Sequence, residues 1–359
     1  KQGEALIAKI KKHLGEANVV DIKNGGPQKA LRDHKEHADN TRFLVCGGDG
    51  TVGWALQDLD KVRDTGDLAQ DVPFAVLPLG TGNDMARTLG CGGGYGGQKL
   101  LPILENAAKC GEQGMDRWMV HFSGQDAAGA AFQKSVQMCN YFSIGWDALV
   151  ARSFHVKRET SPGLFKNRTI NKLWYAYYAF PKIFGSGVWD VSRGIKVKVD
   201  GREVELPAGI GAFLVINIPS YSGGTDLWGK APSASPLKKP ATDDQMLELV
   251  GTYGPLYQGT IMAGMRHAIR IAQGKTIEVE TKHPREGGPQ PRKGACFQVD
   301  GEPYMADHSG LVEDVRYKAA PPPNDAMITL KVKIEHLKLA KLVAVPQKGG
   351  GCCGAPNVE

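Results

Sequence analysis

The sequence predicts an α/β protein of two domains, the first built on a parallel sheet and the second a β-rich, sandwich-like domain. Three observations predict this fold class. The chain has 359 residues, a length at which a single hydrophobic core stops growing and chains divide into domains. Strand-like and helix-like patterns alternate up to about residue 103, as in βα units. After about residue 114 the pattern changes to short alternating strands.

The elements of the first domain follow from apolar spacing. Val52, Leu56, Leu59 and Val62 recur at helical spacing and predict one amphipathic helix. Strands that alternate with helices form a parallel sheet covered by helices. The predicted helices lie at 3–15, 27–39, 52–62 and from 83 onward, and the predicted strands lie at 18–22, 41–46 and 72–79.

The second domain shows period-two strands joined by tight turns. Asp200-Gly201 and Asp300-Gly301 are dipeptides typical of hairpin turns, which favours a mostly antiparallel sheet or sandwich. A helical interruption at about 147–185 carries a concentration of aromatic residues. The predicted strands lie at 116–122, 139–145, 194–200, 212–218, 276–280 and 327–335. The predicted division of the chain is 1–114 for the first domain, 115–318 for the second, 319–345 for a segment that returns to the first, and 346–359 for a flexible tail.

Composition narrows the class of protein. Hydrophobic residues make up 42% of the chain and charged residues 23%, which is typical of a globular protein. The formal net charge of +6 suits an anionic substrate or an acidic membrane surface, and it is too small to imply nucleic acid. The seven cysteines are scattered and lack paired C-x-x-C spacing, which indicates a reduced, cytosolic chain. No spanning segment or signal peptide is predicted.

Two glycine-rich loops follow successive predicted strands of the first domain. The first lies in "LVCGGDGT" (44–51) and the second in "VLPLGTGND" (76–84). A strand that ends in a glycine-rich turn and leads into a helix presents backbone N–H groups to phosphate. Because ligands of open α/β sheets bind at the carboxyl ends of strands, the pair predicts a nucleotide site. Its predicted residues are Gly47, Gly48, Asp49, Gly50, Thr51, Gly80, Thr81, Gly82, Asn83 and Asp84.

Asp49 is the unusual member of the first loop. A carboxylate repels phosphate, so its predicted role is to hold Mg²⁺, or to accept a proton or a ribose hydroxyl. The alternative is that both loops are ordinary βα turns, with Asp49 or Asn83 as a helix N-cap. A Walker A loop is excluded, because that motif requires a glycine five residues before its Gly-Lys-Ser/Thr. The only Gly-Lys-Thr of the chain, at 274–276, has Ile269 at that position.

The two loops also carry a resemblance to a known family. "GGDGTVGW" (47–54) and "PLGTGNDMAR" (78–87) resemble the catalytic region of eukaryotic diacylglycerol kinases. The element GGDGT alone is shared with NAD kinases, and relatives of it with sphingosine and ceramide kinases. Further segments resemble the accessory domain of the diacylglycerol kinases, and the resemblance extends from about residue 1 to about residue 345. They include "DRWMV" (116–120), "INIPSYSGGTDLWG" (216–229) and "DDQMLELVG" (243–251).

The resemblance implies a nucleotide-binding α/β domain of the NAD kinase and diacylglycerol kinase type, a β-rich accessory domain, and an active site in the cleft between them. It implies that the γ-phosphoryl group of ATP, with Mg²⁺, moves to the free hydroxyl of diacylglycerol and yields phosphatidic acid. The general base is left open between Asp49 and Asp244, and Asp49 is also the predicted metal ligand. Lys157 or Arg158 could neutralise the γ-phosphate.

The implied partners are diacylglycerol and an anionic membrane surface, with the chain attached peripherally from the cytoplasm. Two alternatives stay open. One is another kinase of the same superfamily, acting on NAD or on a sphingoid or ceramide lipid. The other is a non-catalytic module that binds lipid or nucleotide. Family members begin with a further strand and phosphate loop before the position of Lys1, so the chain is expected to be a fragment that lacks this strand.

Overall fold

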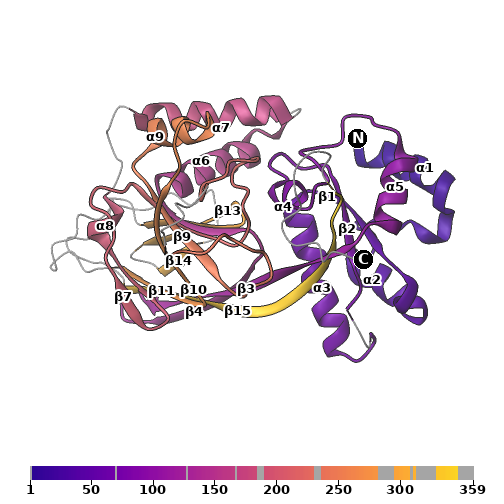
Figure 1. Ribbon diagram of the computed structural model, residues 1–359, viewed down its shortest axis with the longest axis horizontal. Coiled ribbons are helices and arrows are strands. Elements are labelled where there is room, and N and C mark those ends of the chain that lie inside the picture. Colours follow the sequence, from indigo (N-terminus) through magenta and orange to yellow (C-terminus); the bar gives the residue numbers. More distant parts are fainter. Residues whose placement is uncertain are drawn as a thin grey trace. The chain divides into compact units, whose positions relative to one another are not determined.

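The computed structural model of the chain forms two compact units (Figure 1). Unit 1 comprises Lys1–Met115, Ser222–Gly224 and Leu339–Glu359, and unit 2 comprises Asp116–Tyr221 and Thr225–Lys338. Segments 319–328 and 347–359, for which the sequence predicts a returning segment and a tail, lie outside the described residues. The structure describes residues 2–68, 71–126, 128–165, 168–183, 190–229, 236–281, 295–307, 310–312 and 329–346.

Unit 1 is an α/β unit with a parallel sheet. β1 pairs in parallel with β2, with Phe43 opposite Phe74 and Gly47 opposite Pro78. The end of β15 (Thr329–Val343) joins β2 in parallel at Leu342. The parallel sheet predicted for the first domain is therefore confirmed. The elements of unit 1 are α1 (Gln2–Leu14), η1 (Glu16–Asn18), α2 (Gly26–Asp33), η2 (Lys35–Asn40), β1 (Phe43–Gly47), α3 (Asp49–Asp64), β2 (Phe74–Pro78), α4 (Asp84–Thr88) and α5 (Leu100–Lys109).

The helix that follows the first glycine loop is fixed by the apolar residues that predicted it. Val52, Leu56, Leu59 and Val62 are all buried along one face of α3. Burial of each such side chain contributes roughly 1.5–3 kcal/mol. Because α3 starts at Asp49, immediately after β1, this packing also fixes the first turn of the helix beside the loop.

The strand predicted at 18–22 is wrong. The chain there forms the short helix η1 and then an irregular segment. A strand requires a neighbour that shares its backbone hydrogen bonds, and no strand of the described residues pairs with this segment. Val19 instead packs against a core cluster that includes Leu6 and Ile10 of α1, so its apolar character reflects packing on this core.

Unit 2 contains two β-sheets with helices on one of them. The first sheet has the order β15-β11-β6-β7, with β3 beside β15 and β4 beside β3, and the second has the order β10-β9-β8-β5-β12-β13-β14. Antiparallel pairing of β11 with β15 and β6, and of β8 with β5 and β9, confirms the predicted sandwich. The elements are β3 (Glu112–Gln125), β4 (Ala131–Met138), β5 (Tyr141–Gly145), α6 (Trp146–Thr160), η3 (Pro162–Leu164), α7 (Arg168–Ile183), α8 (Val191–Gly194), β6 (Ile195–Val199), β7 (Arg202–Val204), β8 (Ala212–Ile216), β9 (Leu247–Thr252), α9 (Pro255–Met262), β10 (Ile269–Gly274), β11 (Thr276–Thr281), β12 (Ala295–Val299), β13 (Glu302–Asp307), β14 (Gly310–Val312) and β15.

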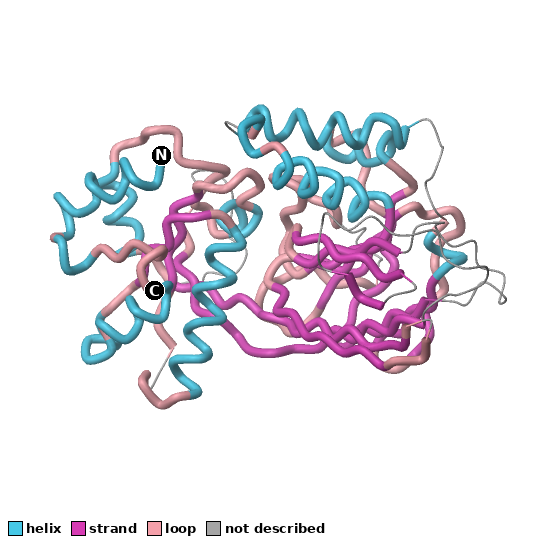
Figure 2. The backbone as a smooth tube through the Cα atoms, turned by 180° about the vertical axis from the view of Figure 1, so that it is seen from behind, coloured by secondary structure: helices cyan, strands magenta, loops and turns pink. Residues whose placement is uncertain are grey.

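The layers of unit 2 are sheet, sheet and helices (Figure 2). Side chains of a strand alternate between its two faces. In β8, Phe213 and Val215 belong to the core cluster between the two sheets, whereas Leu214 and Ile216 belong to the cluster under the helices. The middle strands are therefore apolar on both faces. Among the described residues, no helix has the length and apolarity needed to cross a bilayer.

The predicted hairpin turns are present. Asp200 and Gly201 have φ of 50° and 78°, and Asp300 and Gly301 have φ of 51° and 85°. Two successive residues of positive φ match the twist of antiparallel strands. The half-buried Asp300 carboxylate also accepts hydrogen bonds from three backbone amides that begin at Cys139. Burial raises the pKa of Asp300 to about 6. Asp300 is therefore a structural residue.

Candidate active site

The two glycine loops of unit 1 touch each other through their backbones. β1 ends at Gly47 and β2 at Pro78, so parallel pairing brings both loops to the carboxyl edge of the sheet. A Cβ atom on Gly80 would lie 2.7 Å from the Cα of Gly48, and one on Gly48 would lie 3.0 Å from the Cα of Gly80. Glycine is therefore required at both positions for this close approach.

The other glycines of the first loop have different surroundings. A Cβ atom on Gly47 would lie 2.4 Å from the Cβ of Thr51, so Gly47 allows α3 to begin directly after β1. A Cβ atom on Gly50 would meet nothing within 4 Å. Gly48 is the N-cap of α3 and provides no side-chain hydrogen bond to it. The first turn of α3 therefore faces open space at Gly50, where the partial positive charge of a helix N-terminus attracts an anion.

Asp49 ties the first loop to the second. Its Oδ2 accepts a hydrogen bond of 2.7 Å from the backbone N of Asp84, and its Oδ1 accepts one of 3.3 Å from the backbone N of Met85. These amides open α4, where a carboxylate is favoured by the exposed N–H groups. The structure thus gives Asp49 a positioning contact, because both oxygens already accept hydrogen bonds.

Asn83 closes the second loop on itself. It lies in the left-handed region with φ of 55°, a conformation that asparagine tolerates better than most residues. Its Nδ2 donates to the carbonyl oxygens of Gly80, at 2.8 Å, and Gly93, at 2.9 Å. Its Oδ1 is buried without a hydrogen-bond partner and lies against Gly48 and Gly80. Thr81 and Gly82 complete the turn between these contacts.

Asp84 holds a short segment from the middle of the chain. Its buried Oδ1 accepts hydrogen bonds from the backbone N of Gly223, at 2.9 Å, and of Gly224, at 3.1 Å. Arg87 lies beside the same segment, with its Nη1 3.2 Å from the position of a Cβ on Gly224, and its Nε donates to the carbonyl oxygen of Gly82. Asp84 is thus a structural clamp, and Arg87 is a cation beside the second loop.

The glycine loops fit a phosphate chain better than a fixed metal. The surfaces of Gly48 and Gly80 form a cradle that any side chain would fill, and the orphaned Oδ1 of Asn83 lies beside it. In the part of the chain that the structure describes, no group of three His, Cys, Asp or Glu residues could hold a metal ion. Mg²⁺ commonly binds one or two carboxylates together with substrate phosphates, so it would arrive here with a nucleotide.

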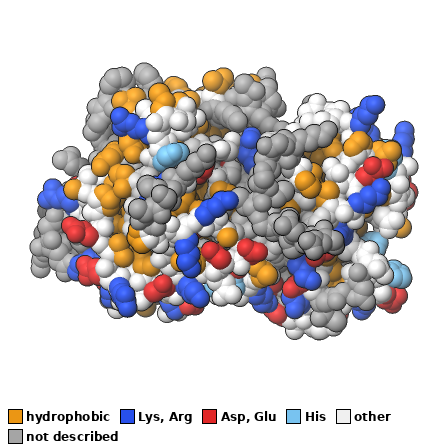
Figure 3. Space-filling model, viewed as in Figure 1, with side chains coloured by type: hydrophobic (Ala, Val, Ile, Leu, Met, Phe, Trp, Pro, Cys, Tyr) orange, Lys and Arg blue, Asp and Glu red, His pale blue; other side chains and the backbone are white. Residues whose placement is uncertain are grey.

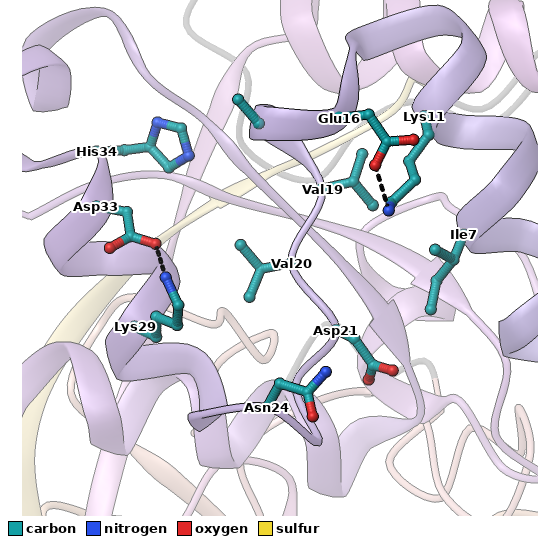
Figure 4. Close-up of a pocket in the computed structure, with 11 residues that line it drawn as sticks. Ile7, Lys11, Glu16, Val19, Val20, Asp21, Asn24, Lys29, Asp33 and His34 are labelled. Atoms are coloured by element: carbon teal, nitrogen blue, oxygen red, sulfur yellow. Dashed lines mark hydrogen bonds and ion pairs between the residues drawn. The ribbon is translucent and has the colours of Figure 1, made fainter.

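A hollow of about 690 Å³ in unit 1 is a second place to consider (Figure 4). It is lined by Ile7 and Lys11 of α1, by six residues between 16 and 24, and by Lys29, Asp33 and His34 in and just after α2, all outside the glycine loops. Both lysines are paired with acids, Lys11 with Glu16 and Lys29 with Asp33. Paired charges leave little attraction for a polyphosphate, so this hollow is a weaker candidate for binding a nucleotide than the glycine loops.

Unit 2 contains three neighbouring carboxylates, Asp116, Asp244 and Glu248, together with His336, which is hydrogen-bonded to Asp116. We call these four residues the carboxylate cluster. Asp116, on β3, is almost fully buried, and its Oδ1 accepts a hydrogen bond of 2.8 Å from Nε2 of His336 on β15. Its Oδ2 accepts one of 2.6 Å from the backbone N of Gln245. Its own backbone N donates to the carbonyl oxygen of Thr242, at 2.6 Å. Asp116 thus fixes the turn that carries Asp244 from both sides.

The pKa values of this cluster are shifted by burial. Burial raises the pKa of Asp244, and the charges of Asp116 and Asp243 add to the rise, while a hydrogen bond from the Met246 amide opposes it. Burial also raises the pKa of Glu248 to about 8. A hydrogen bond from Gln273 Nε2, 3.0 Å long, opposes the Glu248 shift. A carboxylate with a raised pKa is a stronger base, which suits proton abstraction from an alcohol.

Sequence reasoning missed Asp116, Glu248 and His336. Glu248 carried a signal, because it is a charged residue inside the apolar run "LELV" (247–250), all of which is buried. Asp116 and His336 are separated by 220 positions, and no local pattern marks them as partners. Gln245 is also notable, since its φ is 57°. Such a conformation is costly for a residue other than glycine and fixes the direction of the Asp244 turn.

The two cations considered for the γ-phosphate lie beside aromatic rings. Lys157 Nζ lies 5.8 Å from the ring centroid of Trp174, and Arg158 Cζ lies 5.7 Å from that of Phe154. Arg158 Nη2 also lies 3.1 Å from Nδ1 of His155. Burial, with the nearby charge of Arg158, lowers the pKa of His155 to about 4. His155 is therefore a neutral, structural histidine near neutral pH.

Comparisons with known proteins find two family models that match this chain. Residues 1–112 match the family model for the diacylglycerol kinase catalytic domain, and residues 137–303 match that for the diacylglycerol kinase accessory domain. Diacylglycerol kinase theta of Homo sapiens is 39% identical over 312 residues, which cover 85% of this chain and 31% of that protein. Diacylglycerol kinase theta of Mus musculus is 37% identical over 312 residues, which cover 85% of this chain and 32% of that protein. The chain thus spans about a third of the length of these relatives. A solved structure from Bacillus anthracis str. Sterne is 17% identical, with a TM-score of 0.44, and covers 90% of this chain and 84% of its own.

Proposed function

Because the chain belongs to the diacylglycerol kinase family, we propose that it transfers the γ-phosphoryl group of ATP to the free hydroxyl of 1,2-diacylglycerol, forming phosphatidic acid. The observation that carries the proposal is the backbone contact of Gly48 and Gly80 at the ends of two adjacent parallel strands. Ligands of such sheets bind at this edge. Acting at a membrane surface, the enzyme would lower the level of diacylglycerol available for signalling.

In this proposal the backbone of unit 1 binds the nucleotide. The phosphates lie at the first turn of α3, near Gly50 and Thr51, and against the second loop at 80–82. Phosphoryl transfer needs positioning and charge stabilisation more than covalent chemistry from the protein. Mg²⁺, when bound with ATP, supplies neutralisation of the phosphate charge. Asp49 is the carboxylate of the first loop that could hold it, in addition to its contacts with α4.

We assign the general base to Asp244 rather than to Asp49. Both oxygens of Asp49 accept hydrogen bonds from backbone amides, and such bonds stabilise the ionised form and weaken it as a base. Burial raises the pKa of Asp244, which strengthens it as a base. Asp244 would take the proton of the diacylglycerol hydroxyl as the phosphoryl group is transferred. Asp116 and His336 would hold the turn on which Asp244 lies.

An assay with radiolabelled ATP tests the reaction and its alternatives together. The chain is offered diacylglycerol in mixed micelles, sphingosine, ceramide and NAD in separate reactions. We expect label in phosphatidic acid. Label only in NADP, or only in a phosphorylated sphingoid or ceramide lipid, would mean that the chain is another kinase of the superfamily and not a diacylglycerol kinase. Binding of Mg-ATP with label in no product would favour the non-catalytic module.

The two carboxylates are separated by their kinetics. Asp244→Asn is expected to lower kcat by about 100-fold or more, with the KM for ATP little changed. Asp49→Asn is expected to raise the KM for ATP, because the loops lose one of their ties. Asp226→Asn, at an exposed carboxylate of unit 2, is the matched control and should leave both constants unchanged. A normal kcat in Asp244→Asn would contradict the assignment of the base.

A further inference from the structure

Exposed large apolar side chains gather on the helical layer of unit 2. Of the eleven exposed large hydrophobic residues among those the structure describes, seven lie on or beside α7 and α9, two helices that pack side by side. We call this surface the α7–α9 face. Figure 3 shows hydrophobic side chains at the surface over this layer. Its residues are Leu164, Leu173, Tyr177, Tyr253, Leu256, Met262 and Met265.

The two helices have distinct inner and outer sides. On α7, Tyr175 and Tyr178 pack against the core under the helices, whereas Leu173 and Tyr177 are 64% and 63% exposed. On α9, Ile261 is buried in the same core, whereas Leu256 is 63% exposed. The core therefore takes one side of each helix, and the exposed residues remain on the other side. Large exposed apolar patches on soluble proteins mark binding surfaces.

The α7–α9 face carries basic residues beside its aromatic side chains. The segments 161–183 and 253–273, from which its exposed apolar residues come, contain no Asp or Glu. Lys157 Nζ lies 5.8 Å from the ring centroid of Trp174 on α7. Arg266 is exposed next to Met265 and lies over the Tyr257 ring, 5.7 Å from its centroid. Lysine and arginine beside exposed leucine, methionine and tyrosine are typical of surfaces that lie in the interface of an anionic membrane.

We propose that the α7–α9 face docks on an anionic lipid bilayer, with the apolar side chains in the interface and the basic residues beside lipid headgroups. The inference deepens the proposed function, on which it rests, because that function takes its lipid substrate from a membrane. A second copy of the chain is the other occupant to consider. Two basic faces brought together would repel each other, whereas an anionic bilayer is complementary to both the apolarity and the charge.

Vesicle sedimentation without ATP or diacylglycerol tests the surface. The parent chain is expected to bind vesicles of phosphatidylcholine with phosphatidylserine, and to bind pure phosphatidylcholine vesicles more weakly. The double variant Leu173→Gln/Leu256→Gln removes apolar area without adding charge and should lower the vesicle partition coefficient about tenfold. Arg266→Gln should lower it about fivefold on the anionic vesicles alone. Leu101→Gln on α5, where Leu101 is 54% exposed, is the matched control and should bind like the parent.

The outcomes are distinguishable. Equal binding of the parent and the double variant to anionic vesicles would contradict the proposal that the α7–α9 face binds the bilayer. Absence of parent binding would contradict it as well. A parent dimer in light scattering that the double variant dissociates would assign the face to a second copy and overturn the lipid proposal. Because these side chains are exposed, the double variant should keep its circular dichroism and its activity on short-chain diacylglycerol in micelles. Vesicle binding without phosphatidic acid formation in any assay would support the surface and overturn only the kinase reaction.

Discussion

The glycine loops of unit 1 and the carboxylate cluster of unit 2 are built by opposite means. In the loops, backbone groups at two adjacent strand ends form the surface, and side chains are absent where Gly48 and Gly80 meet. In the cluster, side chains from separate strands and from the turn of Asp244 come together, and Asp116 is buried at its centre. The two regions should therefore be sensitive to different substitutions. An added Cβ atom should disrupt the packing of the loops, and loss of a carboxylate should disrupt the hydrogen bonds of the cluster.

The largest effect is expected from Asp116→Ala. The change removes the acceptor of both the His336 imidazole and the Gln245 amide inside a buried site. Buried donors left without acceptors cost several kcal/mol together, so we expect a loss of about 3 kcal/mol in the free energy of unfolding. Chemical denaturation measures it. Asp226→Ala, which removes an exposed carboxylate that accepts one amide bond, should cost about 1 kcal/mol or less.

A double-mutant cycle sharpens this expectation. If Asp116 and His336 act as a pair, the effects of Asp116→Ala and His336→Ala should be less than additive. Additive effects, or an Asp116→Ala cost no larger than that of Asp226→Ala, would show that the cluster does not depend on its central carboxylate. The proposed dependence of the unit 2 cluster on buried side chains would then be wrong.

Gly80→Ala tests the other side of the comparison. The new Cβ atom would lie 2.7 Å from the Cα of Gly48, so the two loops must separate. Overpacking of this kind costs about 1–3 kcal/mol, and the KM for ATP should rise with it. Gly53→Ala, on α3 where an added Cβ meets nothing within 4 Å, is the matched control. It should stabilise the helix by about 0.5–1 kcal/mol. An equal response of both variants would contradict backbone contact as the basis of the loops.

The same contrast explains how much the sequence predicts. The loops are contiguous stretches between apolar runs, so glycine, aspartate and strand order together predict their meeting at one sheet edge. Their inner contacts were not predictable, because the choice of Asp49 for the amides of α4 depends on the register of β1 and β2. In the cluster only Asp244 was predicted, and it came from the resemblance. Asp116 and His336 are joined only by the sheet that places β3 beside β15.

The strand wrongly predicted at 18–22 and the exposed side of α7 share one cause. Local apolar spacing reports that a residue avoids water, and it does not report which neighbour covers it. Val19 packs against the core cluster that includes residues of α1, whereas Leu173 of α7 is exposed. Tertiary packing decides both cases, and periodicity alone does not contain it.

Glu248→Gln separates the two regions by the pH dependence of stability. Burial raises the pKa of Glu248 to about 8, above its ordinary value of 4.5. A carboxyl whose folded pKa is raised binds its proton more tightly in the folded state. Its contribution to stability is therefore complete below about pH 4.5 and is lost as the pH rises to about 8. The slope for one group is at most about 1.4 kcal/mol per pH unit.

The glutamine keeps an acceptor for Gln273 Nε2 and cannot ionise, so the variant should lose this slope. Free energies of unfolding measured from pH 5 to pH 9 should diverge, with Glu248→Gln the more stable chain at the alkaline end. Glu278→Gln, at an exposed glutamate of β11, should follow the parent curve. Parallel curves for Glu248→Gln and the parent would mean that the cluster holds Glu248 ionised across this range. Gly53→Ala in unit 1 adds no titrating group, so its difference from the parent should stay constant over the same pH range, because the loops are held by backbone contact.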